Sequence, residues 1–142
     1  MKVKGLECIL LVDDDEATNF VNSYTIKKTG LEVHVQLAAD ARQALDYLTC
    51  KGEYSRLDKY PQPGIVFLDI NMPGMSGWDF LKEYQILPVE QKAHIVIAML
   101  TTSLNPDDRE KGEQNTDIKK FITKPLTAEM LAEVIRANFP QE

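Results

Sequence analysis

The sequence predicts a single α/β domain built around a parallel β-sheet. Three observations support this fold class: five short apolar runs that resemble buried strands, apolar residues at helical spacing between them, and polar motifs directly after four of the runs. Cys8–Val12 is apolar throughout, as expected for a parallel strand covered on both faces. Five β/α units favour right-handed crossovers, with helices on both faces of the sheet.

The first helix is expected to follow Cys8–Val12 directly. Its apolar residues recur at i, i+3, i+4 and i+7 and form one stripe, which we expect to be the buried face: Ala17, Phe20, Val21 and Tyr24. Gly30 marks the end of this helix. In residues 33–37, apolar residues alternate with His34 and Gln36, which is typical of an edge strand with one face in water.

The second helix is predicted to begin after Asp40, an N-cap residue that has Gln43 three positions later. Four residues form its predicted buried stripe: Ala41, Ala44, Leu45 and Leu48. Residues 51–64 are predicted to be the one long loop, because they are polar and contain Pro61 and Pro63.

The third strand is predicted at residues 65–68, and a capping box of Ser76 and Asp79 opens the helix that follows. That helix carries apolar residues at helical spacing: Phe80, Leu81 and Tyr84. Residues 95–100 predict the fourth strand, and Phe121 with Ile122 predicts a short fifth one.

Two further helices are expected. Thr127 opens the last one, which turns three apolar residues inward: Leu131, Val134 and Ile135. The helix before it begins at Asn105 and Pro106, a cap followed by proline at the first helical position. Because residues 107–117 contain no large apolar side chain, this helix has almost no stripe to bury, and we expect it to be marginal and mobile.

Length and composition limit the classes of function. The chain has 142 residues, which suits one domain over residues 1–142 with a core at about 6–139 and no second domain. A net charge of −6 argues against a nucleic-acid surface, which needs clustered lysine and arginine. Cys8 and Cys50 are far apart and outside any CxxC motif, so we expect both to be reduced, in a cytoplasmic protein without signal peptide or membrane span.

Three carboxylates follow predicted strands at the same edge of the sheet. Asp13 and Asp14 leave the first strand, and Asp69 ends the third. They would repel one another unless a cation neutralises them, and hard oxygen ligands at rigid strand ends suit Mg²⁺. Asn71 could add its backbone carbonyl. The alternative for the acidic run is helix capping, which explains Asp15 well but not a pair beside another aspartate.

Phosphoryl chemistry would use the same edge of the sheet. Asp69 is the candidate nucleophile, since a carboxylate can form an acyl phosphate. Thr101 ends the fourth strand and could donate a hydrogen bond to a phosphoryl oxygen, while Lys124 after the fifth strand supplies a positive charge. Taken singly, Thr101 and Lys124 are ordinary residues, and only their shared position favours a catalytic role.

At these residues the chain resembles a receiver domain of a two-component response regulator, the CheY-like family, over essentially its whole length. The resemblance implies a doubly wound, flavodoxin-like sheet with strand order 2-1-3-4-5. It implies phosphorylation of Asp69, magnesium held by Asp13, Asp14, Asp69 and Asn71, and no activity of an enzyme with a separate substrate. It also implies that the peptide bond between Lys124 and Pro125 is cis.

The resemblance further implies a conformational switch that pairs the hydroxyl of Thr101 with the ring of Phe121. Phe121 has no hydroxyl, so the switch would work by packing; a plain core role is the alternative. Thr102 and Asn71 would lie next to the phosphate, and Asn71 with Ser103 would influence the lifetime of the phosphoryl group. The fourth helix, fifth strand and fifth helix would form the surface that responds.

The expected function is that of a stand-alone receiver, phosphorylated by a sensor histidine kinase or a histidine phosphotransfer protein and acting on a downstream protein effector. No contact with nucleic acid or membrane is expected. One alternative is a pseudo-receiver that serves as an unphosphorylated interaction scaffold. A haloacid-dehalogenase-type phosphatase is a weaker alternative, because that class requires Asp-x-Asp and Asn71 occupies the third position.

Overall fold

A computed structural model of the chain describes residues 2–49, 62–70, 72, 74–87, 96–101, 106–114 and 118–139. Within these residues, strands and helices alternate as predicted. In chain order the elements are β1 (Cys8–Val12), α1 (Glu16–Lys28), β2 (His34–Ala38), α2 (Ala41–Thr49), β3 (Ile65–Asp69), α3 (Gly77–Gln85), β4 (Val96–Thr101), α5 (Pro106–Glu113), β5 (Ile118–Thr123) and α6 (Ala128–Asn138).

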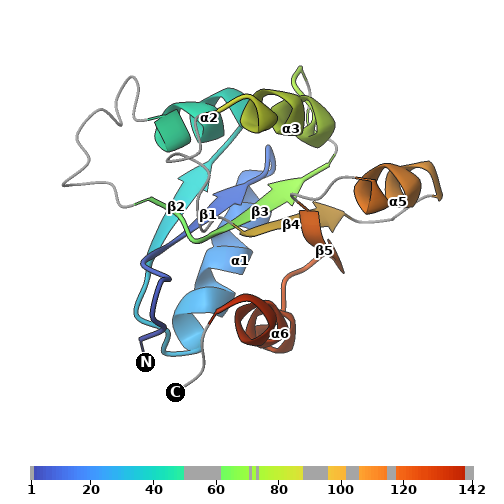
Figure 1. Cartoon of the computed structure of the whole chain (residues 1–142). Helices are drawn as coiled ribbons and strands as arrows, with labels where there is room; N and C mark the ends of the chain where they lie inside the picture. The colour runs from blue at the N-terminus through green and yellow to red at the C-terminus, as the bar shows by residue number, and fades with distance from the viewer. Residues whose placement is uncertain are drawn as a thin grey trace.

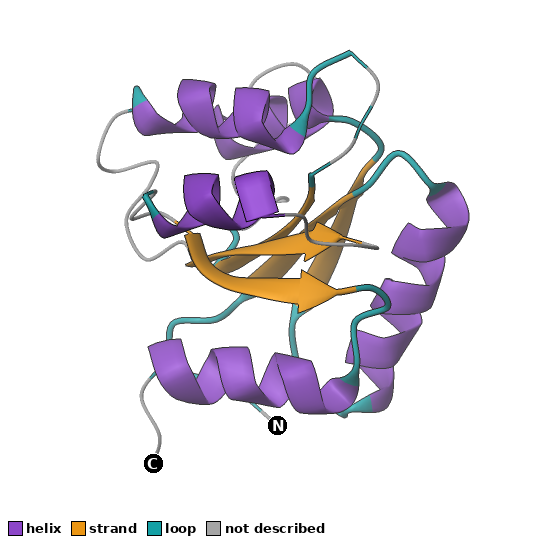
Figure 2. Ribbon diagram, turned by 90° about the vertical axis from the view of Figure 1, so that its right-hand side faces the viewer, coloured by secondary structure: helices purple, strands orange, loops and turns teal. Residues whose placement is uncertain are grey.

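The strands form one parallel sheet in the order β2-β1-β3-β4-β5, which is the order that the resemblance implies. Helices α2 and α3 cover one face, and α1 and α6 cover the other (Figure 1). The view turned by 90° shows the resulting three layers, with the sheet in the middle (Figure 2). All strands point the same way, so their carboxyl ends share one edge.

Successive residues of a strand belong to two separate cores, because side chains alternate between the two faces of a sheet. Ile9 and Leu11 of β1 join the core beneath α1 and α6, whereas Leu10 and Val12 join the core beneath α2 and α3. All five residues of β3 are buried as well. These continuous apolar runs explain why the central strands were recognisable in the sequence.

Several predicted helix ends are confirmed. The capping box of α3 is present, with Ser76 accepting from the backbone N–H of Asp79. Thr127 caps α6, and Asp15 caps α1 by accepting from Ala17 N. Asp40 accepts from Gln43 N over 2.8 Å, as predicted for the start of α2.

The predicted buried face of α1 is wrong. Phe20 is 69% exposed and Tyr24 59%, and Ala17 and Val21 are exposed as well. The inward face instead carries four other residues: Asn19, Asn22, Ser23 and Ile26. Asn19 donates to the carbonyls of Asp13 and Ala38, and Asn22 accepts from Leu126 N–H, so hydrogen bonds with neighbouring segments accompany this orientation of the helix.

Two smaller differences concern the edges of the sheet, and one further predicted helix is present. β5 spans Ile118–Thr123 and is longer than predicted, because its residues pair with β4 around a register shift between Ile97 and Ala98. β2 is an edge strand as predicted, but Leu37 is exposed rather than buried. The polar segment after Pro106 forms a helix, α5, whose mobility stays a prediction.

The first cysteine behaves as predicted. Cys8 is free and buried, and its Sγ lies 3.5 Å from the hydroxyl of Tyr47. Burial raises the pKa of the Cys8 thiol to about 11, more than the contact with Tyr47 lowers it, so the group stays a neutral thiol. Cys50 lies outside the described residues. Among the helices that are described, none has the length and hydropathy required to cross a bilayer.

Candidate functional site

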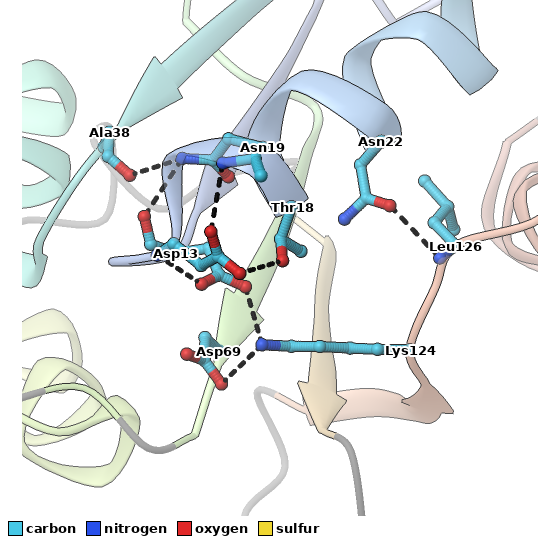
Figure 3. A network of polar contacts seen from close by, with 10 residues as sticks. Asp13, Thr18, Asn19, Asn22, Ala38, Asp69, Lys124 and Leu126 are labelled. Atoms are coloured by element: carbon cyan, nitrogen blue, oxygen red, sulfur yellow. Dashed lines mark hydrogen bonds and ion pairs between the residues drawn. The ribbon is translucent and has the colours of Figure 1, made fainter.

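The site lies where β1, β3 and β5 end at the same edge of the sheet (Figure 3). β1 and β3 are hydrogen-bonded neighbours, with Val12 paired to Leu68, so Asp13 and Asp69 leave adjacent strands side by side. Lys124 follows directly after β5 and reaches across β4 towards both carboxylates. The parallel topology therefore assembles three residues that are widely separated in the sequence.

The three carboxylates predicted from the sequence do come together. Asp13, Asp14 and Asp69 each have a carboxylate oxygen within 4.8 Å of the others. Asp13 is 1% exposed and Asp69 is 4% exposed, whereas Asp14 is open to solvent. Two buried carboxylates and one exposed carboxylate therefore form a single acidic group.

Lys124 offsets part of this negative charge. Its Nζ lies 2.7 Å from Oδ2 of Asp13 and 3.2 Å from Oδ1 of Asp69. The contact with Asp13 joins a charged ammonium to a buried carboxylate oxygen and is an ion pair. Burial lowers the pKa of Lys124, but the contacts with Asp13 and Asp69 outweigh it and the pKa is raised. The ammonium therefore stays charged at neutral pH.

Asp13 is fixed by backbone contacts as well. Its Oδ1 accepts from the backbone N–H of Asp15 over 2.9 Å, and its own N–H donates to Ala38 O over 3.1 Å. Asn19 of α1 donates its side-chain amide to two carbonyls, those of Asp13 (3.0 Å) and Ala38 (3.1 Å). These bonds join the ends of β1 and β2 to α1 and restrict where the Asp13 carboxylate can go.

Gly77 supports the backbone that carries Asp69. Its N–H donates to Ile70 O over 2.9 Å, at the first residue of α3. A Cβ at position 77 would lie 2.6 Å from the carbonyl oxygen of Asp69 and 3.0 Å from Cα of Ile70. Only glycine lets the start of α3 approach the end of β3 this closely.

The remaining predicted residues have different outcomes. Thr101 ends β4 with its backbone paired to Thr123, and its side chain lies outside the described residues, as do Asn71, Thr102 and Ser103. Phe121 is half-buried and packs against the core beneath α2 and α3. The peptide bond between Lys124 and Pro125 is cis, as the resemblance implied.

Sequence reasoning missed two buried asparagines that surround the site. Asn19 holds the end of β1, and Asn22 accepts from the backbone N–H of Leu126 over 3.2 Å, two residues after Lys124. Their i, i+3 spacing puts both on one face of α1. That spacing is visible in the sequence, but the apolar stripe on the opposite face predicts the reverse orientation of the helix.

Comparison with known proteins agrees with this geometry. A family model described as the response regulator receiver domain matches residues 9–136. The chain belongs to this family. It is therefore a receiver domain of two-component signalling, with the CheY-like fold that its carboxylates and lysine suggested.

The relatives are distant in sequence and close in structure. Response regulator Rcp1 of Synechocystis sp. is 31% identical over 100 residues, which is 70% of this chain and 65% of the relative, slightly less than two thirds of its length. A two-component response regulator from Cytophaga hutchinsonii has a TM-score of 0.82 at 29% identity, covering 96% of this chain and 97% of that one. The Mn(2+)-bound form of Rcp1 has a TM-score of 0.72 at 25% identity, covering 95% and 99%.

Proposed function

We propose that this receiver domain accepts a phosphoryl group on Asp69 from a phosphohistidine of a sensor histidine kinase or a histidine phosphotransfer protein. The observation that carries the proposal is the position of Lys124, whose ammonium contacts Asp69 at 3.2 Å and Asp13 at 2.7 Å. A carboxylate held beside a cation can attack phosphorus, and the same cation then faces the oxygens that arrive with the phosphoryl group.

The transfer exchanges one bond for another. A P–O bond forms between a carboxylate oxygen of Asp69 and phosphorus, and the P–N bond to the donor histidine breaks. The electron pair of the broken bond stays on the imidazole nitrogen. Lys124 stabilises the phosphoryl oxygens by charge, and Thr101 donates a hydrogen bond to one of them. The acyl phosphate is later hydrolysed, so the domain has no separate substrate.

We assign a divalent cation, Mg²⁺, to Asp13, Asp14 and Asp69, with the backbone carbonyl of Asn71 as a further ligand. The donor set fits, since the three carboxylates have oxygens within 4.8 Å of one another and Mg²⁺ prefers hard oxygen ligands. A Mn(2+)-bound form of the similar Rcp1 supports a divalent cation. When bound, the cation would neutralise charge on the phosphoryl oxygens.

The output is proposed to pass through the surface formed by α5, β5 and α6, the fourth helix, fifth strand and fifth helix of the sequence analysis. Phosphorylation would draw Thr101 towards Asp69, and the ring of Phe121 would repack, with Thr102 lining the phosphate pocket. Phe121 is half-buried and packs against the core beneath α2 and α3, so a change in its position would be transmitted to that core. We further propose that residues 1–142 form one receiver domain that signals through protein contact, to a downstream effector.

The donor protein is proposed to dock on the exposed face of α1. This helix begins three residues after Asp13, so its surface is continuous with the edge of the site. Phe20, Val21 and Tyr24 are all about half exposed or more. An apolar face of this kind fits the apolar surface of a helical partner that carries the phosphohistidine.

The deciding experiment is intact mass spectrometry after incubation with acetyl phosphate, with and without Mg²⁺. We expect the native chain to gain one phosphoryl group only with Mg²⁺, and Asp69→Asn to gain none. Asp46→Asn, which removes a carboxylate from α2 away from the strand ends, serves as the matched control and should be phosphorylated like the native chain. No gain by the native chain in any condition would instead indicate a pseudo-receiver scaffold.

A further inference from the structure

Asn22 is a buried polar residue on α1 that the proposed chemistry does not use. Its side chain is 1% exposed, and its Oδ1 accepts from the backbone N–H of Leu126 over 3.2 Å. Its Nδ2 is buried and has no hydrogen-bond partner among the residues that the structure describes. A buried amide with only one of its groups satisfied costs stability, so a purely structural position would favour an apolar residue.

The hydrogen bond with Leu126 explains why position 22 is polar. Leu126 lies two residues after Lys124, in the turn between β5 and α6, and the bond joins positions 104 residues apart in the sequence. Figure 3 shows Asn22 and Leu126 beside the chain that leads back to Lys124. The segment that carries the ammonium is therefore tied to α1, the helix that follows Asp13.

Asn19 makes a corresponding hydrogen bond to the backbone of Asp13, the residue that forms the ion pair with Lys124. It holds the carbonyl of Asp13 at 3.0 Å, one helical turn before Asn22 on the same face of α1. One rigid helix thus binds the backbone next to Asp13 and the backbone next to Lys124. The distance between their side chains, 2.7 Å at the ion pair, then depends on two amide contacts to the same helix.

We propose that Asn22 is a positioning residue for Lys124, acting through Leu126. The inference rests on the proposed phosphoryl transfer and adds to it a residue that touches neither Asp69 nor the phosphoryl group. Without this bond the turn after β5 can shift, and the ammonium no longer meets the phosphoryl oxygens at the required distance. Small misplacements of a charged group lower the rate of a transfer far more than they lower folding stability.

The test compares Asn22→Leu with Asn22→Asp in the acetyl phosphate reaction with Mg²⁺. Asn22→Leu has a similar volume but no acceptor, and we expect its rate at saturating donor to fall about tenfold with little change in KM. Asn22→Asp keeps an oxygen that accepts from Leu126 N–H, and its rate should stay within about threefold of native. Amide exchange of the metal-free protein should be faster at Leu126 in Asn22→Leu alone.

A double-mutant cycle separates positioning from a general structural effect. If Asn22 acts through Lys124, adding Asn22→Leu to Lys124→Met should slow the reaction by less than about twofold. Ile26→Ala, a buried change one turn further along the same face of α1, lowers stability but leaves the hydrogen bond between Asn22 and Leu126 in place, and it should leave the rate near native.

Two results would overturn the inference while leaving the proposed function intact. One is an equal slowing by Asn22→Leu with and without Lys124, and the other is unchanged exchange at Leu126. If the native chain gains no phosphoryl group, the proposed function fails and the positioning role fails with it. The Leu126 exchange would then still report whether Asn22 holds this turn.

Discussion

Helices α1 and α2 were predicted by the same rule and have opposite outcomes. In α2 the stripe of Ala41, Ala44, Leu45 and Leu48 is buried as expected. In α1 the stripe containing Phe20 and Tyr24 faces solvent, and asparagines face the sheet. Apolar periodicity therefore predicts the position of both helices. It predicts the buried face correctly only for α2, whose inward face makes no hydrogen bonds to the site.

The comparison shows that apolar periodicity does not predict the buried face of a helix whose polar residues hydrogen-bond to a functional site. The inward face of α2 carries apolar side chains that share a core with residues of β1 and β2, so the hydrophobic effect decides its rotation. α1 follows the carboxylates at the end of β1, and Asn19 and Asn22 bond to segments that carry charged residues. The apolar residues left outside then become available to a partner protein.

The most direct test of this difference between α1 and α2 is to truncate one apolar side chain in each helix. Leu48→Ala, at a fully buried position of α2, should lower the free energy of unfolding by about 2–5 kcal/mol. Phe20→Ala, at a position 69% exposed, should change it by less than about 0.5 kcal/mol. Urea unfolding of both variants measures the difference. A loss for Phe20→Ala as large as for Leu48→Ala would mean that α1 packs with the face first predicted.

A second experiment sharpens the role of the exposed face of α1. Tyr24→Glu places a charge in the apolar patch, and phosphoryl transfer from a phosphorylated donor protein should slow by about tenfold because the charge must be desolvated on docking. Transfer from acetyl phosphate, which needs no docking surface, should be unchanged. Ile86→Glu, at an exposed apolar position after α3, is the matched control and should affect neither reaction. Equal slowing with both donors would argue against docking at Tyr24.

The smallest expected effect concerns the cap of α1. Hydrogen bonds from the Thr18 hydroxyl and the Ala17 N–H lower the pKa of Asp15 below its ordinary value of 3.8. A lowered pKa means that the charged form stabilises the folded state above the unfolded pKa, and that this contribution is lost as pH falls through the folded pKa. Asp15→Asn keeps the cap but loses the charge. The variant should be slightly less stable than native at neutral pH, and the two thermal unfolding curves should converge below pH 3.8. A difference independent of pH would exclude the charge as its cause.

Much of the site could be predicted because its residues are defined by chain order. Asp13, Asp69 and Lys124 each follow an apolar run, and parallel strands bring such positions to one edge of the sheet. The acidic group and its contact with Lys124 follow from that rule. The requirement for glycine at position 77 could not be predicted, because the 2.6 Å approach of its Cβ position to the Asp69 carbonyl depends on the packing of α3 against β3.

The sequence by itself determined the alternation of strands and helices, the two-sided burial of the central strands and the residues that carry charge at their ends. These features depend on local periodicity and on chain order, both of which can be read along one chain. Only the tertiary structure decided the rotation of α1 and the partners of Asn19 and Asn22, because these depend on backbone groups of distant residues such as Ala38 and Leu126. The spacing of the two asparagines can be read along the chain, but a hydrogen-bond partner 104 residues away cannot.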